Sequence, residues 1–383
     1  MNKELSHFAA TLRGLISNRR PPIGDRQFSA LALELFALQF RENIAYRKIC
    51  AVRSLTPQIV EHWTQIPAVP TGALKEMEFT SIPPGERTAV FYSSGTTEQK
   101  PSRHFHCAES LAVYEASLWT WFGENLLRSA DGSSASPDET RGHAVRAPIF
   151  LTPPPTQVPH SSLVYMFETV RQKLGALESA FVGKLTLDGA WTLNFNAVTV
   201  KLAENSKLKI QNPKLILGTA FSFVHLLDFL VEKNLHLTLP AGSRVLETGG
   251  YKNRSRSLSK NELHALITER LGVTRENILC EYGMSELSSQ AYDSGIQHSK
   301  FKIQNSERQF QFPTWSRVQI ISPETGREVA EGETGLIRIF DLANVFSVAA
   351  IQTEDLGVRR GEGFELLGRA ALSEPRGCSL MAA

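Results

Sequence analysis

The chain has 383 residues, which is enough for one large domain or two ordinary ones and for a sizeable buried core. Its 41 Lys and Arg residues against 39 Asp and Glu residues give a formal net charge of +2, which argues against a protein that follows a polyanion such as nucleic acid. A composition of 42% hydrophobic and 21% charged residues is typical of globular proteins and excludes a disordered chain.

The cysteines and the N-terminus predict where the protein works. Cys50, Cys107, Cys280 and Cys378 are far apart and form no CxxC pair, which favours a reduced chain over a disulfide-bonded one. The N-terminal segment lacks the continuous apolar block of a signal peptide, and no apolar run approaches the roughly 20 residues of a membrane-spanning helix. We therefore expect a cytoplasmic protein with no membrane span and no nucleic-acid partner.

Residues 1–85 are expected to be largely helical. Asp25 can cap a helix whose apolar residues, from Phe28 to Leu38, recur close to the 3.6-residue period. Thr56 and Pro57 predict a second helix start, since proline is favoured at the first helical position. The proline-rich stretch 67–84 predicts extended chain, because proline disfavours helix in the residue before it.

From residue 86 onward, short apolar runs alternate with helical patterns. Strands are expected at 88–92, 148–151, 215–217, 244–246 and 278–280, and helices at 109–127, 162–174, 221–233 and after a capping box at Ser259. This alternation predicts an α/β domain with a largely parallel sheet, whose loops gather at the C-terminal ends of the strands. Turn signals in the last part of the chain predict a strand-rich C-terminal region.

One segment, residues 92–102, has the composition of an anion-binding loop. Small hydroxyl residues surround Gly95 directly after a predicted strand, so backbone amides and hydroxyls can converge on a polyphosphate. Lys100 can add positive charge, and Thr96 or Thr97 can reach a metal ion bound to the phosphates. The segment does not fit the P-loop pattern, and a polar strand-to-helix turn is the alternative interpretation.

Two further segments carry groups suited to a nucleotide. Tyr282 ends a predicted strand and can stack on a planar base, while Glu286 can hold Mg²⁺ beside phosphates. The alternative is a buried tyrosine and a surface glutamate. Asp355, expected in a loop, can accept two hydrogen bonds from a ribose diol, and Arg369 can add a polar contact. Taken alone, that segment is a turn with a solvated charge.

The three segments in this order resemble the signature motifs of adenylate-forming enzymes, the acyl-CoA synthetase and luciferase superfamily. The narrower match is to LuxE-like acyl-protein synthetases, and it covers the chain from about residue 60 to the end. The matching motifs lie at 93–97 with 100–102, 161–163, 247–252, 283–290 and 376–380. The resemblance implies a large adenylate-forming domain at 86–367, with 1–85 as its N-terminal helical segment and 368–383 as a hinge and tail. The small swivelling C-terminal domain of typical members is expected to be absent.

The resemblance also implies a reaction. A carboxylic acid, with long-chain fatty acid as the family's substrate, reacts with MgATP to give an acyl-adenylate and pyrophosphate, and the acyl group then passes to a protein cysteine. Positioning and neutralisation of phosphate charge are the protein's main tasks in such chemistry. The residues implied to bind ATP are Ser94, Gly95, Thr96, Thr97, Gly249, Gly250, Tyr282, Gly283, Asp355 and Arg369, with Lys100 on the phosphates and Glu286 on Mg²⁺.

Cys378 falls where LuxE proteins carry the acylated cysteine. Arg376 would favour its thiolate modestly, and a tail residue without a role is the alternative. Glu98 departs from the superfamily pattern, which has a second glycine there. An acyl-transferring or reductase protein is the expected partner. Two other functions stay open: a CoA ligase of the phenylacetate type, and a non-catalytic nucleotide- or acyl-binding subunit of a biosynthetic complex.

The pattern of His104, His106 and Cys107 also invites a metal interpretation. Both histidines would point to one side of a strand. No second His/Cys cluster in the sequence completes a zinc motif, so positions near the phosphate or acyl pocket are the favoured interpretation.

Overall fold

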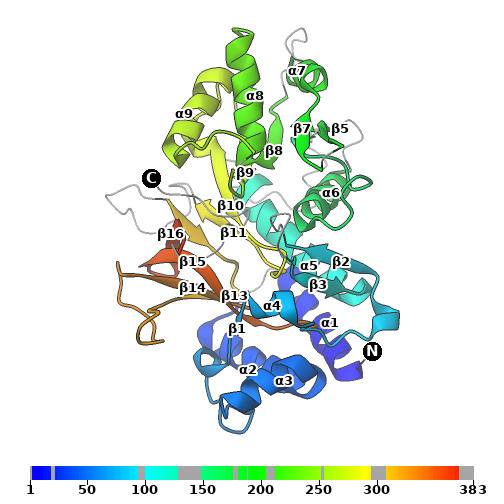
Figure 1. Cartoon of the computed structure of the whole chain (residues 1–383), viewed down its shortest axis with the longest axis vertical. Helices are drawn as coiled ribbons and strands as arrows, with labels where there is room; N and C mark the ends of the chain where they lie inside the picture. Colours follow the sequence, from blue (N-terminus) through cyan, green and yellow to red (C-terminus); the bar gives the residue numbers. More distant parts are fainter. Residues whose placement is uncertain are drawn as a thin grey trace. The chain divides into compact units, whose positions relative to one another are not determined.

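A computed structural model describes residues 2–18, 22–93, 100–127, 148–175, 180–187, 189–203, 212–251, 254–294 and 308–370 (Figure 1). The described residues fall into two compact units. The first unit draws on Met1–Trp121, Gly283–Ala291 and Gln309–Pro375, and the second on Phe122–Tyr282 and Tyr292–Arg308. No helix within these ranges is both long and apolar enough to cross a membrane. The domain boundaries expected from the sequence stay a prediction.

The N-terminal part of the first unit is helical, as predicted. Its helices are α1 (Lys3–Ser17), α2 (Asp25–Glu42), α3 (Ile44–Val52), α4 (Ala73–Glu76) and α5 (Ala108–Phe122), with 3-10 turns η1 (Trp63–Gln65) and η2 (Pro84–Glu86). The helix predicted from Asp25 is confirmed, and its buried side chains include Phe28, Leu35 and Phe36. The capping role predicted for Asp25 is wrong, because Gly24 is the N-cap residue, no side chain caps the helix, and Asp25 is its first helical residue.

The helix predicted from Thr56 is wrong. The carbonyl of Thr56 accepts from the backbone N–H of Ile59 and of Val60, so one turn forms. The turn is not extended, because the next free N–H, on Glu61, donates to the side chain of Gln65 at 2.8 Å. The stretch 67–84, predicted as extended, contains the short strand β1 (Val69–Pro70) but also α4.

Strands dominate the remainder of the first unit. They are β2 (Ala89–Tyr92), β3 (Arg103–His106), β12 (Gln309–Gln311), β13 (Ser316–Ile321), β14 (Thr334–Asp341), β15 (Ala350–Arg360) and β16 (Gly363–Arg369). β2 and β3 form an antiparallel pair, and β13-β14-β15-β16-β12 follow one another in antiparallel order with β1 parallel to β15. The strand-rich C-terminal region is thereby confirmed.

The second unit is built on parallel strands with helices between them. Its elements are η3 (Gly123–Leu127), β4 (Ile149–Phe150), α6 (Ser162–Leu174), β5 (Ala180–Phe181), β6 (Gly183–Leu185), β7 (Trp191–Leu193), α7 (Phe195–Ala203), β8 (Leu215–Thr219), α8 (Ala220–Glu232), β9 (Arg244–Thr248), α9 (Lys260–Leu271), η5 (Arg275–Asn277), β10 (Ile278–Tyr282) and β11 (Ala291–Ser294). β5, β4, β8, β9 and β10 pair in parallel in that order. The predicted alternation and parallel sheet are confirmed.

Helices α8 and α9 lie beside the strands of this sheet (Figure 1). They share one apolar core with these strands. Val245 and Ile278 from the sheet and Leu263 and Ile267 from α9 are all at most 1% exposed. The predicted capping box opens α9, with the Ser259 hydroxyl accepting from the backbone of Glu262 and the Glu262 carboxylate accepting from the backbone of Ser259. The local signals and the packing therefore agree in this unit.

Candidate active site

The predicted phosphate segment connects two antiparallel strands of the first unit. Ser94, Gly95, Thr96 and Thr97 lie outside the described residues, and β2 and β3 flank them. Ser93 and Ser102 pair at the base of this connection, where the Ser93 hydroxyl accepts from the backbone N–H of Ser102 at 2.9 Å. The segment therefore joins two strands and not a strand to a helix, and the choice between an anion-binding loop and a plain polar turn stays open.

Lys100 is the one predicted phosphate ligand of this loop that the structure describes. Its Nζ lies 3.7 Å from Glu76 Oε2, and both side chains are more than half exposed. An exposed pair at this distance contributes little to stability. The lysine is therefore accessible to an anionic ligand, and its predicted role stays a prediction.

Glu286 is a buried carboxylate held by two hydroxyl groups. It is 3% exposed, accepts from Ser102 Oγ at 2.6 Å on Oε1 and from Ser285 Oγ at 3.0 Å on Oε2. The interpretation as a surface glutamate is wrong. The Ser102 contact brings the base of the phosphate loop and the Glu286 segment together within the first unit.

Two stacked histidines occupy β3 beside this carboxylate. The rings of His104 and His106 are 4.7 Å apart, on one side of the strand as predicted. Burial lowers the pKa of His104 to about 4, against the opposing influence of the Glu286 charge. Burial and the neighbouring His104 also hold the pKa of His106 well below its ordinary value. Both rings are therefore neutral near pH 7.

A buried aspartate anchors the segment that carries Glu286. Asp341, at the end of β14, accepts from the backbone N–H of Ser288 at 3.0 Å and of Ser289 at 2.8 Å. Asn344 completes the anchor, because its side chain donates to the Glu286 carbonyl at 2.9 Å and accepts from the Ser288 hydroxyl at 2.7 Å. Sequence reasoning missed both residues, although two polar residues in an otherwise apolar run at 339–346 are a signal.

Asp355 and Arg369 face each other across two antiparallel strands. They pair in register on β15 and β16, with Arg369 Nε 3.6 Å from Asp355 Oδ1 and both side chains 7% exposed. The expectation of a loop aspartate is wrong, because Asp355 lies inside an 11-residue strand. Arg369 also donates to Glu354 at 2.6 Å, while its Nη1 has no hydrogen-bond partner among the described residues. The carboxylate predicted to bind the ribose is therefore buried and lies beside the guanidinium of Arg369.

The remaining predicted nucleotide residues leave the sheet of the second unit at neighbouring strand ends. The β9–β10 register places Thr248 opposite Glu281, so the next residues, Gly249 and Tyr282, follow side by side. Gly249 has φ +68°, which a side chain would strain, and Tyr282 is 2% exposed. Gly250 is buried beyond the strand.

The two strand ends are also joined by a side-chain contact. The Thr248 hydroxyl donates to the Glu281 carboxylate, and burial, assisted by the Glu247 charge, raises the pKa of Glu281 to about 7. Gly283, the residue after Tyr282, already belongs to the first unit. Cys378 lies outside the described residues.

The fold matches solved structures of one ligase in several states. With 2-hydroxyisobutyryl-CoA ligase in the postadenylation state, bound to 2-HIB-AMP, the TM-score is 0.61 at 14% identity, over 90% of this chain and 67% of that chain. An open conformation of that ligase with 2-HIB-AMP and CoA gives a TM-score of 0.61 at 14% identity, over 92% of this chain and 76% of that chain. The fold is therefore that of the adenylate-forming enzymes, as expected.

Sequence comparison then gives the family. The family described as acyl-protein synthetase, LuxE, matches residues 166–383. The long-chain-fatty-acid–luciferin-component ligase of Aliivibrio fischeri is 22% identical over 365 residues, which span 91% of this chain and 86% of that protein. Fold and family together define an acyl ligase of the adenylate-forming type. The chain belongs to the LuxE family of acyl-protein synthetases, and the resemblance found in its motifs is confirmed.

Proposed function

We propose that this chain activates a carboxylic acid, with long-chain fatty acids first among candidates, as an acyl-adenylate and passes the acyl group to a protein cysteine. The fatty acid is proposed from the named activity of the A. fischeri relative. The observation that supports the chemistry best is the Ser102–Glu286 contact, since it joins the base of the phosphate loop to a buried carboxylate. A site that binds MgATP needs both features close together.

The first step needs positioning and charge neutralisation more than covalent catalysis. An oxygen of the substrate carboxylate attacks the α-phosphorus of ATP, an O–P bond forms, and the bond to the β-phosphate breaks with release of pyrophosphate. In this proposal Lys100 and the residues at 94–97 contact the phosphates, and Asp355 accepts from the ribose hydroxyls. Gly249 and Gly250 allow close approach of the nucleotide, and Tyr282 with Gly283 contacts the adenine.

The residues around Glu286 fit a magnesium ion. A carboxylate beside the hydroxyls of Ser102 and Ser285 offers oxygen ligands only, which are the ligands that Mg²⁺ prefers. When bound with ATP, the ion would neutralise charge that develops on the phosphates. Arg369 would contribute through Asp355, by orienting that carboxylate.

In the second step the thiolate of Cys378 attacks the acyl carbon. A C–S bond forms, the C–O bond to the phosphate breaks, AMP leaves, and the thiol proton passes to solvent. The thioester would then serve an acyl-transferring or reductase partner. The assignment to Cys378 rests on its position in the family motif at 376–380.

ATP–pyrophosphate exchange with purified protein, Mg²⁺ and a panel of fatty and aryl acids tests the first step. We expect exchange that depends on one acid class. Absence of exchange across the panel, with ATP binding confirmed, would contradict the enzyme assignment and favour the nucleotide- or acyl-binding subunit.

The variant Cys378→Ser distinguishes the two possible acyl acceptors, the protein cysteine and CoA. We expect it to keep acid-dependent exchange and to lose the hydroxylamine-sensitive acyl-protein, with Cys107→Ser, which alters a buried cysteine, as the matched control. Full turnover of Cys378→Ser with CoA as acceptor would instead favour a CoA ligase of the phenylacetate type.

A further inference from the structure

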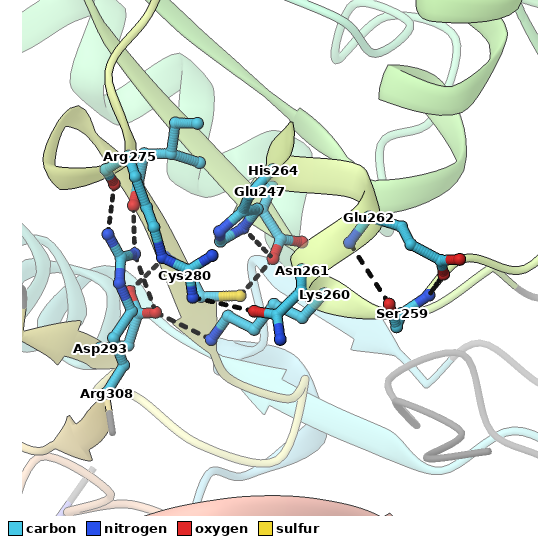
Figure 2. Close-up of polar contacts among 11 residues, drawn as sticks. Glu247, Ser259, Lys260, Asn261, Glu262, His264, Arg275, Cys280, Asp293 and Arg308 are labelled. Carbon is cyan, nitrogen blue, oxygen red and sulfur yellow. Dashed lines mark hydrogen bonds and ion pairs between the residues drawn. The ribbon is translucent and has the colours of Figure 1, made fainter. Parts of the chain in front are cut away.

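Three polar side chains are buried together in the core of the second unit. Glu247 on β9 and Cys280 on β10 are neighbours in the parallel register, so both side chains leave the sheet on the same face. Helix α9 contributes His264 to the same place (Figure 2). Each of the three residues is at most 2% exposed. Polar groups at such positions require partners, because desolvation is costly.

The donor atoms of this cluster are spaced like metal ligands. The Cys280 thiol donates to Glu247 Oε1, His264 Nε2 lies 3.4 Å from that same oxygen, and one donor atom of each residue lies within 4.8 Å of the others. A tetrahedral zinc ion with bonds of about 2.0–2.3 Å places adjacent ligand atoms roughly 3.3–3.7 Å apart. The imidazole and the carboxylate already have this spacing, and the sulfur reaches it by moving outward once its proton has left.

Hydrogen bonding within the cluster is incomplete. Glu247 Oε2 and His264 Nδ1 have no hydrogen-bond partner among the described residues. A buried acceptor left in this state costs about 1–3 kcal/mol. The nearby cation Lys260 makes its ion pair with Asp293 at 2.8 Å, and Asp293 also binds Arg308 at 3.2 Å (Figure 2). A small cation inside the cluster would offset the negative charge of the Glu247 carboxylate.

We propose that Glu247, His264 and Cys280 bind a structural zinc ion. A thiolate, an imidazole and a carboxylate form a ligand set that suits Zn²⁺, whereas Mg²⁺ and Ca²⁺ prefer oxygen ligands alone. Binding replaces the S–H bond of Cys280 with an S–Zn bond and releases one proton to solvent. The thiolate and the carboxylate then carry two negative charges, which balance the ion, and water takes the fourth position.

This ion would fasten α9 to the ends of β9 and β10. Glu247 lies two residues before Gly249, and Cys280 lies two residues before Tyr282. Loss of zinc would therefore loosen the two strand ends that carry the proposed nucleotide contacts. Zinc binding at this cluster does not depend on the acyl-adenylating function. Metal content and cobalt spectra measure it, and neither would change if that function were absent.

Metal retention by the full-length protein is the first test. Purified protein is loaded with zinc, dialysed against metal-free buffer and analysed by elemental mass spectrometry. We expect about one zinc per chain in the wild type and in Cys107→Ser, and at least about tenfold less in Cys280→Ser and His264→Gln. Cys107 is the matched control because it is a buried cysteine of the first unit and does not belong to the cluster.

Cobalt provides a second readout that does not depend on affinity alone. With Co²⁺ in place of zinc, a thiolate-to-cobalt charge-transfer band is expected in the wild type and in Cys107→Ser, but not in Cys280→Ser, whose folding is checked by circular dichroism. Wild-type protein that retains no more zinc than Cys280→Ser, or a cobalt spectrum unchanged in Cys280→Ser, would overturn the proposal. The three residues would then form only a hydrogen-bonded core cluster.

Discussion

Replacing Asp341 with asparagine tests whether this carboxylate anchors the Glu286 segment. Its Oδ2 accepts from the backbone N–H groups of Ser288 and Ser289. Its Oδ1 accepts from the hydroxyls of Ser289 and Ser316 and from the backbone N–H of Ala343, at 2.7 to 3.0 Å. The side chain is 0% exposed. Since backbone N–H groups only donate, this arrangement requires an acceptor on both sides of the residue 341 side chain.

An asparagine cannot meet that requirement in either orientation. If its NH₂ group replaces Oδ2, two backbone N–H groups lose their acceptor. If it replaces Oδ1, the Ala343 N–H loses its acceptor, and the hydroxyls of Ser289 and Ser316 must turn. Each orphaned buried donor costs about 1–3 kcal/mol, so Asp341→Asn should lower the free energy of unfolding by roughly 3 kcal/mol.

Urea unfolding followed by tryptophan fluorescence measures this loss. Ser316→Ala is the control, because it removes one hydroxyl donor and should cost only about 1 kcal/mol. Under conditions where Asp341→Asn stays folded, its pyrophosphate exchange should also fall at least about tenfold, because Glu286 is no longer held in place. An Asp341→Asn protein within about 1 kcal/mol of the wild type would refute the anchoring role.

Three further predictions follow from the described geometry. Asp355→Asn should raise the KM for ATP at least about tenfold and leave the KM for the acid unchanged, as hydrogen bonds to a charged group are worth about 1.5–3 kcal/mol each; an equal rise in both values would contradict ribose binding. Burial lowers the pKa of His104, which lies beside His106, from 6.5 to about 4 against the opposing influence of the Glu286 charge. The neutral ring therefore contributes stability above pH 6.5 that is lost as the pH falls toward 4. His104→Gln should therefore reduce the loss of unfolding free energy between pH 6.5 and 4. An unchanged pH dependence would contradict this contribution of His104. Finally, burial raises the pKa of Cys50 to about 11, so this thiol should be alkylated only after denaturation. The buried Cys107 should behave in the same way. Quantitative mass spectrometry measures the alkylation of both.

The parallel sheet of the second unit could be predicted because its signals are local. Each strand is a short apolar run, and Ser259 and Glu262 form a capping box that needs no distant partner. The wrong prediction of a helix at Thr56 also has a local cause. The side chain of Gln65 accepts from the backbone of Glu61 and so competes with the helix that Thr56 and Pro57 favour.

The burial and the contacts of the site residues involve partners far away in the sequence and could not be predicted. The buried carboxylate of Glu286 accepts from Ser102, which lies 184 positions away in the sequence. Asp355 lies in a strand and faces Arg369 on the next strand, so a cation accompanies the carboxylate at this buried position. Patterns along the chain do not encode such pairs, so the sequence predicts neither the burial of Glu286 nor the strand position of Asp355.

The cluster of Glu247, His264 and Cys280 was missed although the sequence contains a signal. A glutamate and a cysteine interrupt the apolar runs of β9 and β10, and His264 occupies a position on the buried face of α9. Each interruption alone is unremarkable in a core. Only the strand register and the covering helix bring the three together.

Direct detection of the intermediate tests the central claim, that this chain forms an acyl-adenylate. The full-length protein, MgATP and the acid that supports exchange would be mixed under single-turnover conditions, quenched in acid, and analysed for acyl-AMP by mass spectrometry. We predict acyl-AMP that requires both ATP and the acid, that accumulates in Cys378→Ser, and that is at least about tenfold lower in Glu286→Gln. ATP binding without any acyl-AMP, in the wild type and in Cys378→Ser alike, would contradict the account.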